Sequence, residues 1–332
     1  MNKAKCEAED YIQFLIAAQK TFSTVEAAAS HPARNDAPAH DAYTRLLERL
    51  PPDSAALWVE VSEHLDKTSG ILVIDDSTLD KPHARHMGLV SRHWSGKQHQ
   101  VVQGINLVSL VWTDGDCCLP IDYRIYHKDT DGLTKNDHFQ AMLDTANSRG
   151  LEPALVAFDG WYASLDNLKQ VRGLGWQWLT RFKSNRQVSL SIGNTLAVSA
   201  IPDIPRDGRL VHLTGYGQIR LFRLVATNGD VEHWATSLLT LTEDGRAIYA
   251  NRAWRIEEYH RSLKQFTGIE RGQFRRPRRQ RNHIGLALRA FVRLELHRVS
   301  VWVSHAQAKT SIIREAIRLY LSNPSICLPS TA

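Results

Sequence analysis

The 332-residue sequence predicts a mixed α/β fold, in which a sheet with the order β-β-β-α-β-α-β follows an N-terminal helical region. Residues 71–74 and 154–158 are short apolar runs of the kind found in strands buried on both faces. Segments with the spacing of amphipathic helices lie between the later strands. The composition, 43% hydrophobic and 23% charged, is that of a globular protein and excludes a disordered, collagen-like or coiled-coil chain.

The first three strands are predicted to form a meander. The run 71–74 ends in two aspartates, and a basic loop connects it to a long second strand over 101–112. The turn after that strand contains Asp114-Gly115, a dipeptide that accepts positive φ in hairpins. Residues 117–126 return as the third strand.

Two helices bring in the remaining strands. We expect helices over 136–149 and 164–172, with strands 154–158 and 176–182 following them in turn. A glycine- and proline-marked β-rich segment covers 186–242. Three further helices are predicted at the end of the chain, over 246–264, 282–305 and 309–321.

Cysteine use and hydropathy indicate a reducing compartment. The four cysteines show no CxxC spacing, so we expect free thiols rather than disulfides or a zinc site. The N-terminus lacks the pattern of a signal peptide, and no uncharged apolar run is long enough to span a membrane. We therefore expect a cytoplasmic protein with no membrane partner.

Acidic residues follow both apolar runs. Asp75 and Asp76 follow the first run and Asp159 follows the second, so parallel pairing of these strands would bring carboxylates together. Close carboxylates repel one another, and a divalent cation with a preference for oxygen ligands, Mg²⁺ or Mn²⁺, resolves that repulsion. Glu257, on a predicted helix rich in basic residues, is the candidate third acid. Only one of Asp75 and Asp76 can face the site, and we choose Asp75 because it directly follows the apolar run.

Three motifs resemble those of bacterial insertion-sequence transposases of the DDE class. Ile74-Asp75-Asp76-Ser77-Thr78 resembles the first-acid motif, and Phe158-Asp159-Gly160-Trp161-Tyr162 resembles the second. The segment from Tyr249 and Arg252 through Glu257 to Lys264 resembles the Tyr-Arg-Glu-Lys signature. Six residues separate Glu257 from Lys264, as in that signature, but the spacing from Arg252 to Glu257 is one residue longer, so Arg255 or Arg261 could replace Arg252.

The resemblance implies a ribonuclease-H-like catalytic domain interrupted by a β-insertion. Its implied parts are an N-terminal helical domain (1–67), the first part of the catalytic domain (68–185), the insertion (186–242), the C-terminal helical part of the catalytic domain (243–306), and a final helix and tail (307–332).

The implied activity is metal-dependent DNA cleavage and strand transfer. Asp75, Asp159 and Glu257 would hold two Mg²⁺ or Mn²⁺ ions, and the partner would be double-stranded DNA, bound by a homodimer in the synaptic complex. The residues implied to contact DNA are the motif aromatics and the basic residues of the signature helix and the segment after it: Trp161, Tyr162, Tyr249, Arg252, Arg255, Arg261, Lys264, Arg275, Arg276, Arg278 and Arg279.

The distribution of charge agrees with a DNA partner near Glu257. The chain carries a net charge of +6, whereas residues 252–281 contain ten Lys/Arg and three Asp/Glu, a net charge of +7. Residues 1–70 contain seven Lys/Arg and eleven Asp/Glu, which argues against a strong phosphate-binding face there. Two alternatives remain open: a ribonuclease-H-like DNA nuclease, and a domesticated, inactive DNA-binding relative.

Overall fold

A computed structural model describes residues 4–33, 36–95 and 100–324. Its contacts separate the chain into two compact units. Unit 1 comprises Met1–Asp53, His86–Gly88 and Arg261–Ala332, and unit 2 comprises Ser54–Arg85 and Leu89–His260. The division passes through one helix, α9 (Arg255–Phe266). The boundaries of the five parts expected from the sequence remain predictions.

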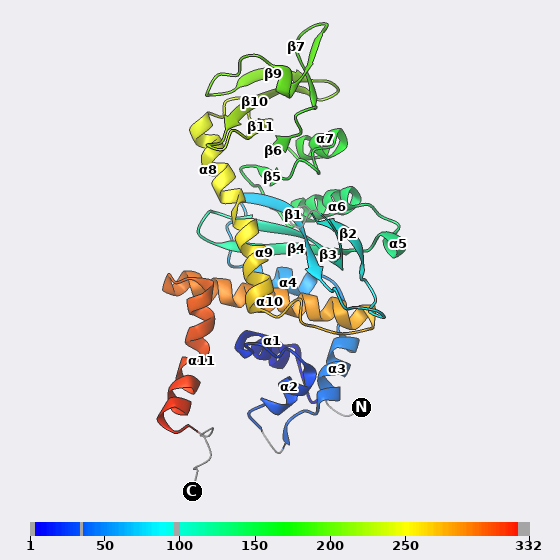
Figure 1. Ribbon diagram of the computed structural model, residues 1–332, viewed down its shortest axis with the longest axis vertical. Coiled ribbons are helices and arrows are strands. Elements are labelled where there is room, and N and C mark those ends of the chain that lie inside the picture. The colour runs from blue at the N-terminus through cyan, green and yellow to red at the C-terminus, as the bar shows by residue number, and fades with distance from the viewer. Residues whose placement is uncertain (1–3, 34–35, 96–99, 325–332) are drawn as a thin grey trace. The chain divides into compact units, whose positions relative to one another are not determined.

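Unit 2 is built on a large mixed sheet. Its strand order is β2-β3-β1-β5-β6-β11-β10-β9-β7-β8, and β4 pairs with β3 off this path. β1 (Ile71–Asp80) pairs antiparallel with β3 (Gln100–Thr113) and parallel with β5 (Val156–Phe158). β5 pairs parallel with β6 (Trp178–Phe182), so the parallel core consists of β1, β5 and β6 (Figure 1).

β1 does not end at its aspartates, as the apolar run suggested. The parallel pairing with β5 stops at Ile74 because β5 has only three residues. The antiparallel pairing with β3 continues to Asp80, since β3 has 14 residues and follows β1 along its whole length. Asp75 and Asp76 therefore lie within β1, at the point where its β5 neighbour ends.

The basic loop expected after the first strand is partly a strand. β2 (Ser91–Ser95) pairs antiparallel with the first residues of β3. β4 (Cys118–Tyr126) pairs with the later part of β3. β2 was missed because it is short and polar and lacks the apolar pattern of a buried strand.

Helices α4 and α6 of unit 2 pack on its sheet. α4 (Ala55–Val61) contacts β4, and α6 (Lys135–Ser148) contacts β3, β4 and α7 (Leu165–Gly173). Side-chain oxygens of Thr134 and Ser164 accept backbone N–H bonds at the starts of α6 and α7, which satisfies donors that a helix leaves unpaired. A one-turn helix, α5 (Lys128–Asp131), precedes α6.

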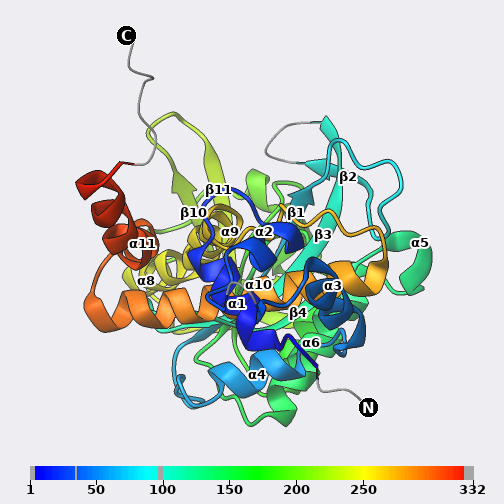
Figure 2. The same ribbon diagram turned by 90° about the horizontal axis from the view of Figure 1, so that it is seen from below.

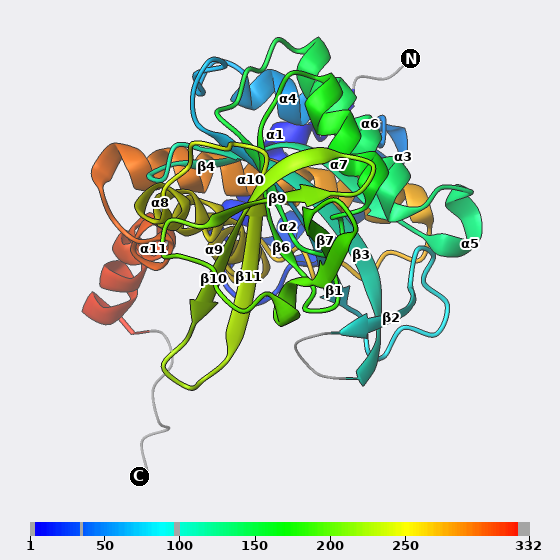
Figure 3. The same ribbon diagram turned by 90° about the horizontal axis from the view of Figure 1, so that it is seen from above.

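The β-rich insertion extends the main sheet. β11 (Val231–Thr236) pairs with β6 and also with β10 (Gly217–Val225), which continues the sheet away from β1 (Figure 3). The other insertion elements are β7 (Gln187–Ser191), β8 (Asn194–Ala197), a 3₁₀ turn η2 (Val198–Ala200) and β9 (Arg209–Leu213).

The single helix expected over 246–264 is two helices. α8 (Glu243–Ala253) and α9 are separated at Trp254. The Glu257 N–H donates to the Trp254 carbonyl three residues earlier, at 3.0 Å. This spacing is that of a tight 3₁₀ turn rather than of an α-helix. The additional residue between Arg252 and Glu257 therefore falls at a helix break.

Unit 1 is helical. α1 (Ala8–Ala17), α3 (His40–Arg49) and α11 (His305–Ser322) pack on α10 (Pro277–Val301), and α2 (Thr24–Ala29) packs on α3 (Figure 2). The Tyr11 hydroxyl bonds the His283 ring at 3.0 Å inside this bundle. The N-terminal helices therefore share one core with the C-terminal helices.

Cys6, Cys117 and Cys118 are buried free thiols, and Cys327 lies outside the described residues. Within residues 4–33, 36–95 and 100–324, no helix has both the length and the apolar character needed to cross a bilayer.

Candidate active site

Strand register places two of the predicted acids side by side. The parallel ladder pairs Ile74 with Phe158, and Asp75 and Asp159 are the next residues on their strands. Parallel neighbours in register point to the same face of a sheet, so both carboxylates face one side. Short strand β5 and the longer β1 thus deliver these acids to one edge.

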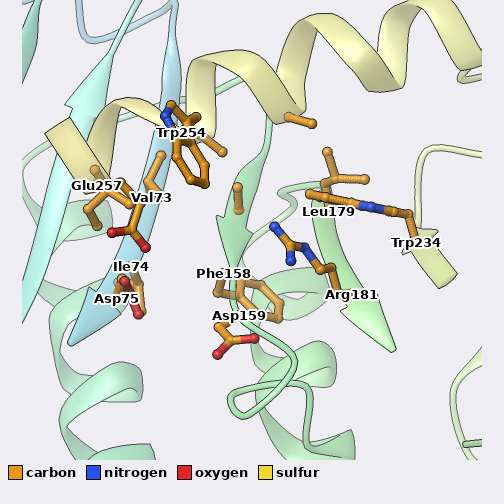
Figure 4. A pocket seen from close by; sticks show the side chains of 14 residues that line it. Val73, Ile74, Asp75, Phe158, Asp159, Leu179, Arg181, Trp234, Trp254 and Glu257 are labelled. Carbon is orange, nitrogen blue, oxygen red and sulfur yellow. The ribbon is translucent and has the colours of Figure 1, made fainter. Parts of the chain in front are cut away.

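Glu257 reaches the same place from α9. The first turns of α9 are anchored on the sheet because Tyr259 is buried and its hydroxyl lies 3.1 Å from the Ser109 hydroxyl of β3. Asp75, Asp159 and Glu257 line a single pocket. In Figure 4, Glu257 points from α9 toward Asp75, and Asp159 lies beside them at the end of β5.

Asp75 is electrostatically strained in this pocket. Burial raises its pKa well above the ordinary value, and the negative charges of Asp76, Glu257 and Asp159 raise it further. The buried ring of His260 lies 3.9 Å from the Asp75 carboxylate. A cation between the acids would remove the repulsion that raises this pKa.

The acidic side chains that line the pocket offer carboxylate oxygens as metal ligands, and such ligands suit a divalent cation that prefers oxygen. In the described part of the chain, no group of three or more His, Cys, Asp and Glu side chains is already gathered around a possible metal position. The three carboxylates therefore share a pocket without forming a ready-made cluster.

Asp76 faces the other side of β1. Its carboxylate accepts hydrogen bonds from Lys135 Nζ (2.7 Å), Asn106 Nδ2 (2.8 Å) and the Tyr162 hydroxyl (3.0 Å). Burial alone would raise the pKa of Asp76, but Lys135 and these hydrogen bonds outweigh burial and lower it. Of the two adjacent aspartates, Asp75 lines the pocket and Asp76 does not.

The two aromatic residues of the second motif differ in position. Trp161 is 49% exposed, and Lys135 Nζ lies 5.4 Å from the centre of its ring. Tyr162 is fully buried, stacks on Phe139 and donates its hydroxyl to Asp76. The expectation that Tyr162 contacts DNA is corrected here, because no part of its ring is accessible to a base.

Arg181 joins the acids. It belongs to a basic cluster after the fifth predicted strand, with Lys183 and Arg186, that we expected near the acids and able to contact DNA, but it was not among the candidate site residues. Phe158 pairs with Thr180, so Arg181 of β6 occupies the same row as Asp75 and Asp159. It lines the pocket, pairs with Glu232 at 3.0 Å and lies 5.0 Å from the Trp234 ring centre. The basic cluster was its signal in the sequence, whereas its place in the row with Asp75 and Asp159 depends on the strand register.

The two arginines before Glu257 have separate surroundings. On α8, the Arg252 guanidinium lies 6.0 Å from the Tyr249 ring centre, and neither residue lines the pocket. Arg255 pairs with Glu258 and donates to the Asp116 carbonyl at 3.0 Å.

In unit 1, part of the basic segment has a structural role. Arg276 and Arg279 pair with Glu48 of α3 at 3.5 and 2.5 Å. Arg278 donates to the Leu50 carbonyl at 3.0 Å, at the C-terminal end of α3. These bonds place positive charge where a helix end is negative, so they stabilise the packing of α10 on α3.

The other predicted contacts of unit 1 remain accessible to different degrees. Arg261 and Arg275 are exposed, whereas Lys264 is partly buried and pairs with Glu270 at 3.4 Å. The charge run read from the sequence thus contains both structural and exposed cations.

Comparison with known proteins agrees with this geometry. The family model described as "Transposase DDE domain" matches residues 66–293. A cryo-EM structure of a piggyBac transposase synaptic complex with hairpin DNA matches with a TM-score of 0.52 and 12% identity, covering 98% of this chain and 74% of that chain. An identity that low shows a shared fold alone, and no curated protein matches the sequence. The predicted mixed α/β fold with its helical N-terminal region is confirmed, and the chain belongs to the DDE transposase family and functions in DNA transposition.

Proposed function

We propose that this protein cuts DNA at the terminal inverted repeats of its own insertion sequence and transfers the freed ends to a target. The observation that carries the proposal is a row of three residues at neighbouring parallel strands: Asp75 of β1, Asp159 directly after β5 and Arg181 of β6. Glu257 from α9 completes it. Three acids and one guanidinium facing one pocket suit a site that handles a phosphodiester.

Asp75, Asp159 and Glu257 would hold the metal, with two Mg²⁺ or Mn²⁺ ions expected. When bound, such ions supply an activated oxygen nucleophile and stabilise the leaving oxygen. No lysine is among the described residues that line the pocket, so the carboxylate oxygens face no ammonium group from its lining. Asp76, in contrast, is already neutralised by Lys135 on the other face of β1.

Arg181 would bind a phosphate oxygen of the DNA. Its guanidinium carries several N–H donors, and Glu232 and Trp234 hold it at the pocket without enclosing it, since its side chain is 49% exposed. Trp161, exposed beside the loop of Asp159, would offer a stacking surface to a base. Double-stranded DNA and a homodimer that pairs two ends complete the proposal.

The test is cleavage of a duplex that carries the inverted repeats flanking the gene. Wild-type protein should cut it only with Mg²⁺ or Mn²⁺, and Asp159→Asn should remove the activity. Asp166→Asn, an exposed aspartate seven residues later on α7, is the matched control and should cut normally.

A second substrate separates transposase from nuclease. A pre-cleaved end with a free 3′-hydroxyl should be joined to target DNA, which a simple nuclease cannot do. Cleavage that persists unchanged in Asp159→Asn would overturn the metal site. DNA binding without any cleavage by the wild type would favour an inactive relative.

A further inference from the structure

A second polar cluster lies behind the acids, on the opposite face of β1. Asp76 uses both carboxylate oxygens there: Lys135 and Asn106 donate to one, and Tyr162 donates to the other. The side chains of Lys135 and Asp76 are only 18% and 23% exposed, and Tyr162 and Asn106 are buried. Charged hydrogen bonds in such surroundings are stronger than those at a surface.

The cluster joins the two strands that carry the acids. Asp76 immediately follows Asp75 on β1, and Tyr162 closes the turn that begins at Asp159. That turn is fixed by a 2.9 Å bond from the Tyr162 N–H to the Asp159 carbonyl. The parallel ladder between β1 and β5 ends one residue before the acids, so backbone pairing does not hold Asp159 to Asp75. The Tyr162–Asp76 hydrogen bond spans that gap.

Lys135 has a related role. As the first residue of α6, it brings a positive charge to Asp76 and also lies against the Trp161 ring. It offsets the negative charge of Asp76, which otherwise adds to the repulsion on Asp75. The cluster therefore couples the acids to the turn that carries the exposed tryptophan.

We infer that Asp76 and Tyr162 are positioning residues that hold the carboxylates of Asp75 and Asp159 at the separation needed to bind the metal. This inference rests on the proposed function, which assigns those two acids to the metal. It also explains why two adjacent aspartates occur on β1: one faces the pocket and the other braces it from behind.

Tyr162→Phe is the most specific test. It removes only the hydroxyl, leaves the ring packed on Phe139, and changes no charge near the pocket. Mn²⁺ binding to the full-length protein, followed by electron paramagnetic resonance, should weaken by about ten- to a hundredfold, the usual cost of losing a support behind a metal ligand. The Mg²⁺ concentration for half-maximal DNA cleavage should rise in parallel, and excess Mg²⁺ should restore much of the rate.

Tyr216→Phe is the matched control. The Tyr216 hydroxyl is also buried and accepts a 2.8 Å hydrogen bond from Trp178, but it belongs to the insertion side of the sheet. Loss of that bond should leave Mn²⁺ binding and the Mg²⁺ requirement unchanged. Thermal melting of both variants shows that each is folded at the assay temperature.

The outcomes are distinct. Mn²⁺ binding by Tyr162→Phe equal to that of the wild type would overturn the inference while leaving the metal site intact. Asp75→Asn should lose cleavage entirely, whereas Asp76→Asn, which keeps an acceptor for Tyr162, should retain part of it. The reverse pattern would show that Asp76 is the ligand and would overturn the inference. A wild type that neither binds Mn²⁺ nor cuts DNA would refute the proposed function itself.

Discussion

We predict that the buried carboxylate of Glu295 stabilises the packing of α10 against α11 by an amount that depends on pH. It is fully buried on α10, receives two 2.8 Å hydrogen bonds from Arg298 one turn later, and lies 2.6 Å from the His305 ring at the start of α11. Burial alone would raise its pKa, but the bonds from Arg298 and His305 outweigh burial and lower the pKa from 4.5 to about 2. The cluster therefore ties α10 to α11.

The lowering of the Glu295 pKa on folding can be expressed as a contribution to the free energy of unfolding. About 2.5 pKa units at 1.36 kcal/mol each give about 3 kcal/mol of stability at neutral pH. Because the folded-state pKa is lowered, this contribution is complete above pH 4.5 and is lost as the pH falls toward 2. At pH 4 it should already be smaller by about 1 kcal/mol.

Glu295→Gln should therefore lower the free energy needed to open α10 and α11 by about 3 kcal/mol at pH 7. Amide hydrogen exchange over residues 277–322 measures this opening without depending on unit 2. Glu315→Gln is the matched control, because Glu315 also pairs with an arginine three residues later but is 72% exposed. Its effect should stay below about 0.5 kcal/mol. Equal effects of the two variants, or a Glu295 effect that does not shrink between pH 7 and pH 4, would refute the reasoning.

Three further predictions concern the turn after β5, the helical bundle and the basic segment. Gly160→Ala should reduce single-turnover cleavage at least about tenfold, because a Cβ there would lie 2.5 Å from the Arg181 carbonyl and displace the Asp159 turn; an unchanged rate would contradict this. Burial lowers the pKa of Lys309 to about 8, so the wild type should gain stability in thermal melts as the pH rises from 8 toward 10.5, and Lys309→Met should show no such gain. Arg275→Ala should reduce the slope of log affinity for DNA against log salt by about one, whereas Arg279→Ala should chiefly destabilise unit 1; equal slopes for Arg275→Ala and wild type would exclude that phosphate contact.

Local patterns were enough to predict much of the sheet. The apolar runs at 71–74 and 154–158 identified two neighbouring parallel strands, and the acids after them pointed to one edge. β2 escaped because it is short and polar, and the helix break at Trp254 escaped because the helical spacing continues through it. The β-rich character of 186–242 was predicted, but its pairing with β6 was not, because partners distant in the chain leave no periodic signal.

The basic segment after Glu257 shows a different limit. Counting charge indicated a phosphate-binding stretch, yet Arg276, Arg278 and Arg279 bond to α3. These partners are more than 200 residues away in the sequence: 231 residues separate Glu48 from Arg279, and 228 separate Leu50 from Arg278. A charge count cannot distinguish an arginine that caps a helix from one that faces solvent.

The sequence by itself determined the fold class, the family resemblance and the residue types that could hold a metal, since these depend on local hydrophobic pattern and on motifs. Tertiary structure alone decided which residues share a pocket. The register of three parallel strands aligns Asp75, Asp159 and Arg181, while strand alternation turns Asp76 to the opposite face and the burial of Tyr162 removes it from reach of DNA. The physical reason is that successive side chains on a strand point to opposite faces of the sheet. Pairing between segments distant in the sequence then sets which side chains meet.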